Sequence, residues 1–342
     1  SFDKSSILVN SGIETYAHSG DGVVVVTYDS NGSAFYSGGE LQYTGIPPSG
    51  ADGSGVIIAK DGVARVANTL FIPRKMSDSE ARNAAIGNVA LDQAGTLVAQ
   101  LYGNGEQGAM LIPQPTLLGN QNLWQMSDGT VIVDADGDPV GRNDDASGNG
   151  NHATQSVSAD RPLYEADGSL HCLVFDGAGD YLSSSIDALQ PTPSGFTVSF
   201  VVYRSTLNLH GSIVGIYEGA TRFFCLGSGR LALSAKNTNG ETFSLSGGGT
   251  LAPDTYYVVS VTYDAATGDY KLYKDSVEVA SHNDPVGFLY PSSGYLRIGH
   301  CRVSTHLWHG GIGAGVIVSK YLPPSSRLRV ENYLAKLAGV SL

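Results

Sequence analysis

The sequence predicts an all-β protein, and three observations indicate this fold class. Glycine is abundant, at 44 of 342 residues, while charged residues make up only 15%. Short segments rich in β-branched and aromatic residues recur along the chain, and clusters of Gly, Asn and Asp separate them. This pattern is typical of hairpins in an antiparallel sandwich.

The predicted strands are short and closely spaced. We expect them at 22–28, 56–59, 170–175, 196–203, 212–216, 230–234, 256–263, 270–274, 294–298 and 315–318. The turn clusters between them include Asp29-Ser-Asn-Gly32, Asn237-Thr-Asn-Gly240 and Asp264-Ala-Ala-Thr-Gly268, in which Gly and Asn accept positive φ at low cost.

Two segments of the sequence each resemble a later segment, and the two pairs occur in the same order along the chain. Val23–Asp29 resembles Val258–Asp264, and Leu70–Glu80 resembles Val316–Ser326. Each copy of the second block is predicted to form a strand, a turn and the start of an amphipathic helix. This internal similarity indicates two related units, of which the first is the smaller.

The two predicted helices have recognisable start signals. The first begins near Ser77 or Asp78, and the second spans residues 324–338, after Pro323 and before Gly339. The second helix is expected to bury one apolar stripe, formed by Leu328, Val330, Tyr333, Leu334 and Leu337.

The chain is expected to contain two domains. A smaller, partial β unit with one closing helix is predicted at residues 1–95, and a larger β domain with a C-terminal helix at 123–342. Between them, residues 96–122 contain interrupting glycines and prolines and are predicted to form a linker.

Composition also excludes several classes of partner. The net charge of −12 offers no positive field for phosphates, which argues against nucleic acid. No apolar run approaches the roughly 20 residues that span a bilayer, so membrane insertion is not expected. Cys172, Cys225 and Cys301 are too few and too scattered for a disulfide framework, and we expect buried thiols.

From Leu123 onward the chain resembles the laminin G-like, concanavalin A-like lectin domains common in phage tail and gene-transfer-agent appendage proteins. The resemblance lies in Leu123-Trp-Gln, Asp138-Pro-Val-Gly, Asp145-Ala-Ser-Gly-Asn-Gly-Asn-His, Leu173-Val-Phe-Asp-Gly-Ala-Gly-Asp-Tyr-Leu, Tyr295-Leu-Arg-Ile-Gly and the closing strand and helix. It implies a jelly-roll sandwich in the larger domain and a partial laminin G-like unit before it.

The same resemblance implies a calcium site. Family members often bind Ca²⁺ with an aspartate and backbone carbonyls of the first loop, so Asp145, Asn149 and Asn151 are the candidate metal ligands here. The family frequently has a carboxylate on the closing strand, but residues 310–315 of this chain contain none. Calcium is the one cofactor that the resemblance suggests.

Motifs for catalysis were not found. The Glu-x-Asp-x-Glu strand of related glycoside hydrolases is absent, as are a Gly-x-Ser-x-Gly elbow and a His-Glu-x-x-His helix. We therefore expect a binding protein and no catalytic residues.

The candidate ligand site is the loop before the last strand. Sugars stack on aromatic rings while polar side chains take their hydroxyls, and this loop, expected to be exposed at its tip, offers both kinds of side chain. Its candidate residues are His300, Arg302, His306, Trp308 and His309, with Tyr217, Arg222 and Tyr290 as further candidates. The alternatives for the histidines are a packed loop or a metal site.

The predicted function is non-catalytic binding of a host cell-surface polysaccharide or glycan by a component of a phage-like particle, located in the virion or extracellularly. Other virion proteins are expected partners, and a homo-oligomer is left open. Two alternatives remain: a structural module of virion assembly, and a polysaccharide-degrading enzyme on a jelly-roll fold.

Overall fold

The computed structural model divides the chain into two compact units, Ser1–Thr96 and Leu97–Leu342. It describes the strand segments 5–8, 15–18, 24–29, 32–37, 40–44 and 57–58, and residues 93–117, 120–167, 170–185, 194–205, 210–217, 222–225, 228–290, 294–301, 306–340 and 342. The helix predicted to start near Ser77, and the repeated block at 70–80, lie outside the described residues.

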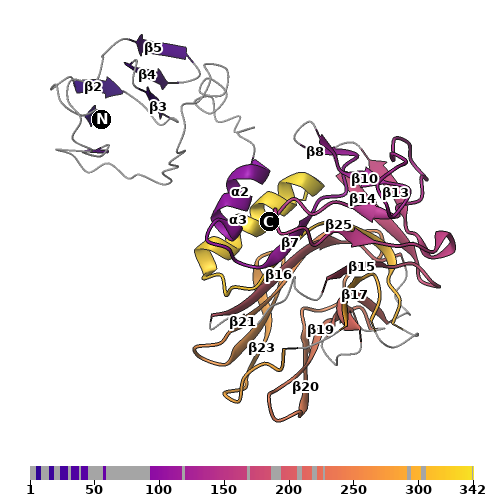
Figure 1. Cartoon of the computed structure of the whole chain (residues 1–342). Coiled ribbons are helices and arrows are strands. Elements are labelled where there is room, and N and C mark those ends of the chain that lie inside the picture. Colours follow the sequence, from indigo (N-terminus) through magenta and orange to yellow (C-terminus); the bar gives the residue numbers. More distant parts are fainter. Residues whose placement is uncertain are drawn as a thin grey trace. The chain divides into compact units, whose positions relative to one another are not determined.

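The first unit contains two small antiparallel sheets in its described part (Figure 1). One sheet has the order β2 (Thr15–His18), β1 (Ser5–Leu8) and β6 (Ile57–Ile58), and the other β3 (Val24–Asp29), β4 (Gly32–Ser37) and β5 (Glu40–Thr44). The repeated Thr-Tyr-Asp sequence ends a hairpin strand in both units, because Asp29 pairs with Gly32 and Asp264 pairs with Asp269.

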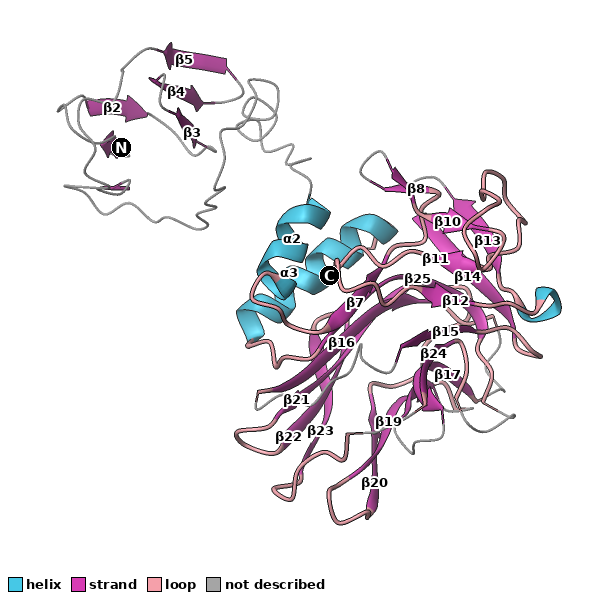
Figure 2. Ribbon diagram, viewed as in Figure 1, coloured by secondary structure: helices cyan, strands magenta, loops and turns pink. Residues whose placement is uncertain are grey.

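The second unit is a sandwich of two antiparallel sheets that face each other (Figure 2). We call them the β10–β20 sheet and the β13–β23 sheet. The β10–β20 sheet has the order β10 (Leu123–Trp124), β11 (Arg142–Asn143), β12 (Ala153–Thr154), β15 (Leu182–Ser185), β24 (Tyr295–Ile298), β17 (Gly211–Tyr217), β18 (Arg222–Cys225), β19 (Leu231–Lys236) and β20 (Thr242–Gly247).

The β13–β23 sheet has the order β13 (Leu163–Asp167), β14 (Leu170–Asp176), β25 (His309–Val318), β16 (Gly195–Val202), β21 (Tyr257–Asp264), β22 (Asp269–Lys274) and β23 (Val277–Asn283), with β7 (Gly108–Leu111) also paired to β25. The remaining elements of the described part are a short hairpin, a 3₁₀ turn and two helices. They are β8 (Thr116–Leu117) with β9 (Asn120–Gln121), η1 (Ser158–Asp160), α2 (Gln93–Tyr102) and α3 (Pro324–Ala338). The predicted all-β sandwich with a C-terminal helix is confirmed.

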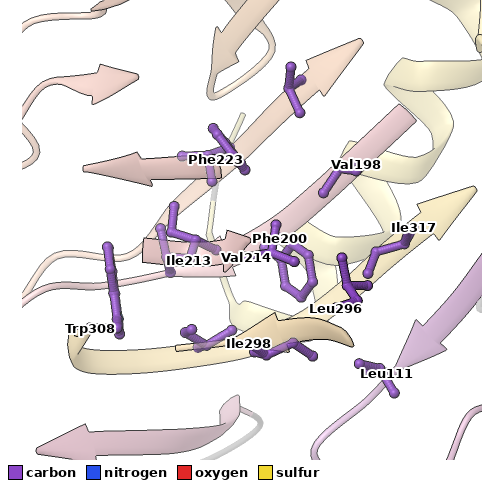
Figure 3. Close-up of a cluster of buried hydrophobic side chains, with 14 of the residues drawn as sticks. Leu111, Val198, Phe200, Ile213, Val214, Phe223, Leu296, Ile298, Trp308 and Ile317 are labelled. Carbon is purple, nitrogen blue, oxygen red and sulfur yellow. The ribbon is translucent and has the colours of Figure 1, made fainter. Parts of the chain in front are cut away.

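The core lies between the two sheets and is formed by alternate residues of their strands (Figure 3). Along β16, Phe196, Val198 and Phe200 belong to this core. The residues between them are buried as well, because α3 packs over the other face of this sheet, and Ser199 is hydrogen-bonded to Ser260 at 2.8 Å. Strand β16 is therefore covered on both faces.

Helix α3 has the predicted bounds, with Pro324 in its first turn and Gly339 at φ 63° after its end. Its buried face contains Val330 and Leu334 of the predicted stripe, but Leu328 is 37% exposed. Arg327 and Glu331 are buried instead and paired with each other. The guanidinium carbon of Arg327 lies 3.6 Å from the ring centroid of Tyr273. A charged pair thus belongs to the buried face of α3 together with the apolar residues.

The predicted linker at 96–122 is wrong. In α2, Leu97 and Leu101 are buried, and β7 pairs with β25 from Gly108↔Val318 to Leu111↔Gly315. The residues from Leu97 onward belong to the second unit. The glycines and prolines among them lie at the ends of short elements of that unit. Neither α2 nor α3, the helices of the described part, is long and apolar enough to cross a membrane.

Candidate functional site

The outer face of the β10–β20 sheet follows from strand alternation. In β24, Leu296 and Ile298 belong to the core, so Tyr295 and Arg297 point away from it. Tyr295 is 57% exposed, an unusual value for a large aromatic side chain on a strand. The structure therefore presents an aromatic ring and a guanidinium on one face of one strand.

Arg297 is held in place by two rings. Its guanidinium carbon lies 4.1 Å from the ring centroid of Tyr181, and its Nη1 is 2.9 Å from Nδ1 of His300. Tyr181 immediately precedes β15, and its ring centroid is 5.6 Å from that of His300. The three side chains form one packed cluster, which we call the Arg297 cluster.

The protonation state of His300 fits this contact. Burial, and then the charge of Arg297, lower the pKa of His300 to about 4. The imidazole is therefore neutral near pH 7, and its Nδ1 accepts a hydrogen bond from the guanidinium. An oriented arginine beside an exposed tyrosine can take sugar hydroxyls or an acidic group while the tyrosine ring stacks on a sugar face.

The prediction of an exposed Trp308 is wrong. Trp308 is 1% exposed, its Nε1 donates to the carbonyl of Gly311 at 3.2 Å, and it belongs to the hydrophobic core (Figure 3). The loop turns inward here: the backbone N–H of Trp308 donates to Gly299, and Trp308 packs against Gly211. Trp308 is therefore a core residue and offers no stacking surface.

The predicted histidine cluster is divided among three places. His300 belongs to the Arg297 cluster, His306 stacks on His210 at 5.4 Å between centroids, and His309 pairs in register with Asp176. Arg302 lies outside the described residues. Among the residues that the structure describes, no group of three or more His, Cys, Asp or Glu side chains could hold a metal ion.

Two of the three remaining candidates lie on strands of the same sheet, close in register to Tyr295 and Arg297. Tyr217 is the register partner of Tyr295, and Arg222 lies across from Gly215, which in turn pairs with Arg297. The structure describes the backbone of both residues and not their side chains. Tyr290 packs edge-on against Phe288, with centroids 4.7 Å apart, at the border of the core.

The proposed calcium ligands do lie together, but their contacts do not fit a cation. Both carboxylate oxygens of Asp145 accept protein hydrogen bonds, from the backbone N–H groups of Met110, Ser147 and Asn151 and from the Ser147 hydroxyl, at 2.7–2.9 Å. Asn149 and Asn151 both donate to the carbonyl of Gly108. Donors surround this carboxylate where a calcium ion needs oxygen acceptors. These contacts argue against calcium binding by this loop, and a titration with Ca²⁺ tests it.

Sequence reasoning missed Tyr181, Tyr295 and Arg297 as site residues. The alternation Tyr295-Leu-Arg-Ile298 carried the signal for an outward Tyr and Arg. The pairing of β24 with β15, which brings Tyr181 to Arg297, joins segments that are distant in the sequence, and no local pattern indicates it.

Residues 176–325 match the family model of the concanavalin A-like lectin/glucanases superfamily. Together with the observed sheets, this match shows that the second unit has a concanavalin A-like fold, as the resemblance implied. No curated protein matches the chain.

Several solved structures are similar at low identity. The CBM40 of the Ruminococcus gnavus IT-sialidase bound to alpha2,3 sialyllactose is 15% identical, with a TM-score of 0.35 over 40% of this chain and 82% of that one. The botulinum neurotoxin serotype D ligand binding domain in complex with N-acetylneuraminic acid is 15% identical, with a TM-score of 0.46 over 69% and 52%.

The binding domain of Paraclostridial Mosquitocidal Protein 1 is also 15% identical, with a TM-score of 0.45 over 65% of this chain and 56% of that one. The chain thus spans about half the length of these two binding domains. None of these likenesses bears on what this chain binds.

Proposed function

We propose that the second unit binds a glycan without transforming it, on the outer face of the β10–β20 sheet. The observation that carries this proposal is the exposed Tyr295 beside an Arg297 that Tyr181 and His300 orient. A stacking ring next to a fixed polar group is what sugar recognition requires, and the match to a lectin and glucanase superfamily supports it.

The finer proposal is that this glycan is a host cell-surface polysaccharide and that the chain acts as an adhesin of a phage-like particle, in the virion or extracellularly. It is supported by the resemblance of the Asp145 loop and the closing strand and helix to phage appendage domains. Binding to host cells with and without their capsule tests it, and equal binding to both would argue against a capsular receptor.

A glycan array probed with the whole chain tests the general proposal. We expect binding to a restricted set of glycans, and we expect Arg297→Gln to abolish or strongly weaken it. Arg329→Gln is the matched control, because Arg329 is an exposed arginine of α3. An array without binding, or an Arg297→Gln variant that binds like the wild type, would overturn the proposal.

One observation favours an enzyme as the second candidate. Burial, and then the charges of Asp176 and Asp160, raise the pKa of Asp180 to about 6. Burial acts on Asp176 in the same direction, but hydrogen bonds from the backbone N–H groups of Ala178, Gly179 and Asp180 outweigh it. The pKa of Asp176 is therefore below its usual range. Two nearby carboxyls with pKa values moved apart resemble an acid and base pair.

The position of Asp180 argues against this role, since the residue is 6% exposed and its carboxylate accepts the backbone N–H of Asp176 at 2.9 Å. Release of reducing ends from a bound polysaccharide, lost in Asp180→Asn, would establish the enzyme. The third candidate, a structural module, is favoured if the chain assembles into particles and binds no glycan.

A further inference from the structure

A row of outward residues continues from Arg297 to the edge of the sheet. Register pairs Arg297 with Ser183, Ser183 with Thr154, Thr154 with Arg142, and Arg142 with Trp124. Paired residues of antiparallel strands point to the same face. The residues preceding them in the strands, such as Leu123, Ala153 and Leu182, are buried in the core, so the row faces outward.

The far end of this row is a second oriented aromatic side chain. The indole N–H of Trp124 donates to Oδ2 of Asp144 at 2.8 Å, while the other carboxylate oxygen of Asp144 contacts Arg142 and lies 2.9 Å from Nδ1 of His152. Trp124 is half-buried as a residue, and the hydrogen bond of its indole N–H fixes the direction of its ring. Gly129 packs beside the indole and the Arg142 guanidinium, so a ligand reaches the part of the ring that this loop leaves open. A ring held in this way loses little conformational entropy on binding.

The middle of the row is a floor of small hydroxyl side chains. Thr154 and Ser183 are both half-buried, and the Thr154 hydroxyl donates to the Ser183 carbonyl at 3.4 Å. Neither side chain is large enough to interrupt the surface between Arg142 and Arg297. The row therefore has an aromatic or charged group at each end and hydroxyl groups between them.

The length of the row limits what can contact all of it. Trp124 and Arg297 are separated by four interstrand steps, through β11, β12 and β15. At ~4.8 Å a step, the row is about 19 Å long. One sugar ring can contact one end of it, whereas a chain of several sugar units can contact both.

We propose that the ligand of this face is an extended oligosaccharide or polysaccharide segment, which crosses the strands from β24 to β10 and stacks on Trp124 as a second platform. This inference rests on the proposed glycan binding at the Arg297 cluster. It adds the class of ligand, a polymer bound along its length, and it names Trp124 as the residue that only longer ligands contact.

The test measures affinity against chain length. Size-separated oligosaccharides of dextran, chitin, alginate and hyaluronan, from disaccharide to octasaccharide, are titrated into the full chain by calorimetry, next to the polysaccharides themselves. We expect affinity in the binding series to rise about tenfold with length, as one added aromatic contact predicts, and then to level off.

Two variants assign the effect of length to this row. Trp124→Ala should remove the gain with length and leave disaccharide binding within about twofold of the wild type, while Trp124→Phe should restore part of the gain. Thr154→Leu, which fills the floor and leaves both ends in place, should also weaken long chains selectively. The melting temperature of each variant shows that the fold is retained.

The outcomes separate this inference from the proposed function. Affinity that is independent of length, or a Trp124→Ala variant that weakens short and long chains equally, overturns the extended ligand and leaves glycan binding at the Arg297 cluster standing. Absence of binding to every series and to the polysaccharides overturns both.

Discussion

Arg297 of β24 places its guanidinium carbon 4.1 Å from the ring centroid of Tyr181, the residue just before β15. The contact joins two strands of the β10–β20 sheet on its outer face and fixes the direction in which the guanidinium points. If Arg297 binds a glycan, Tyr181 is the residue that positions it.

Replacement of Tyr181 should therefore weaken binding through Arg297. A cation–π contact at a partly exposed site contributes about 0.5–1 kcal/mol, so we expect Tyr181→Leu to reduce glycan affinity roughly two- to fivefold. Calorimetric titration of the array's best glycan measures this. Tyr181→Phe, which keeps the ring, should bind like the wild type, and equal losses in the two variants would contradict the positioning role.

Trp308 should be required for stability and not directly for binding. Because the residue is 1% exposed, truncation to Ala should cost about 3–5 kcal/mol of the free energy of unfolding. Urea denaturation of Trp308→Ala and Trp124→Ala provides a matched comparison. The half-buried Trp124 should cost clearly less, and a Trp308→Ala variant as stable as the wild type would show that the indole lies outside the core.

The contrast between these two tryptophans shows where sequence reasoning reaches its limit. The hairpin from Tyr257 to Lys274 and the end of α3 at Gly339 were predictable, because alternation, turn residues and a left-handed glycine are local signals. Whether the loop before Trp308 turns inward depends on contacts with Gly211 and Gly299, which are distant in sequence or without a local signal.

The same reason explains why the sequence indicated only part of the candidate site. The sequence placed His300 in the candidate loop, but its partners Arg297 and Tyr181 lie on β24 and directly before β15, two strands whose pairing no single segment encodes. The linker prediction was wrong for a related reason. The glycines and prolines at 96–122 lie at the ends of short elements, such as β7, whose partner β25 is distant in the sequence.

Asp145 should act as a structural hydrogen-bond acceptor. Replacement of Asp145 leaves the backbone N–H groups of Met110, Ser147 and Asn151 without their acceptor. Each buried donor without an acceptor lowers the free energy of unfolding by about 1–3 kcal/mol. We expect Asp145→Ala to lose on the order of 3 kcal/mol of stability in urea denaturation. Added Ca²⁺ or a chelator should not change the melting temperature of the wild type. A rise of several degrees with Ca²⁺ would show that the loop holds the ion.

Asp180 should make stability depend on pH. Burial raises its pKa to about 6 in the folded state, whereas an unfolded aspartate titrates near ~3.9. The folded state binds this proton more tightly, so ionisation of Asp180 disfavours folding: the penalty is absent below about pH 4, grows as pH rises, and is complete above about pH 6.

Asp180→Asn removes that penalty and retains an oxygen that can accept the Asp176 N–H. We expect its melting temperature, relative to the wild type, to be higher at pH 7 than at pH 4. Melting curves of both proteins across this range measure the difference. A constant offset between the two proteins at all pH values would mean that Asp180 titrates normally in the folded state.

The most direct test of glycan binding at this face is the affinity of Tyr295→Ala. Tyr295 is 57% exposed, so its removal should leave the melting temperature unchanged, while loss of the stacking ring should weaken glycan binding by about 2 kcal/mol, or more than tenfold. Val277→Ala, 65% exposed on β23 of the other sheet, is the control and should bind normally. Undiminished binding by a folded Tyr295→Ala protein would contradict the account.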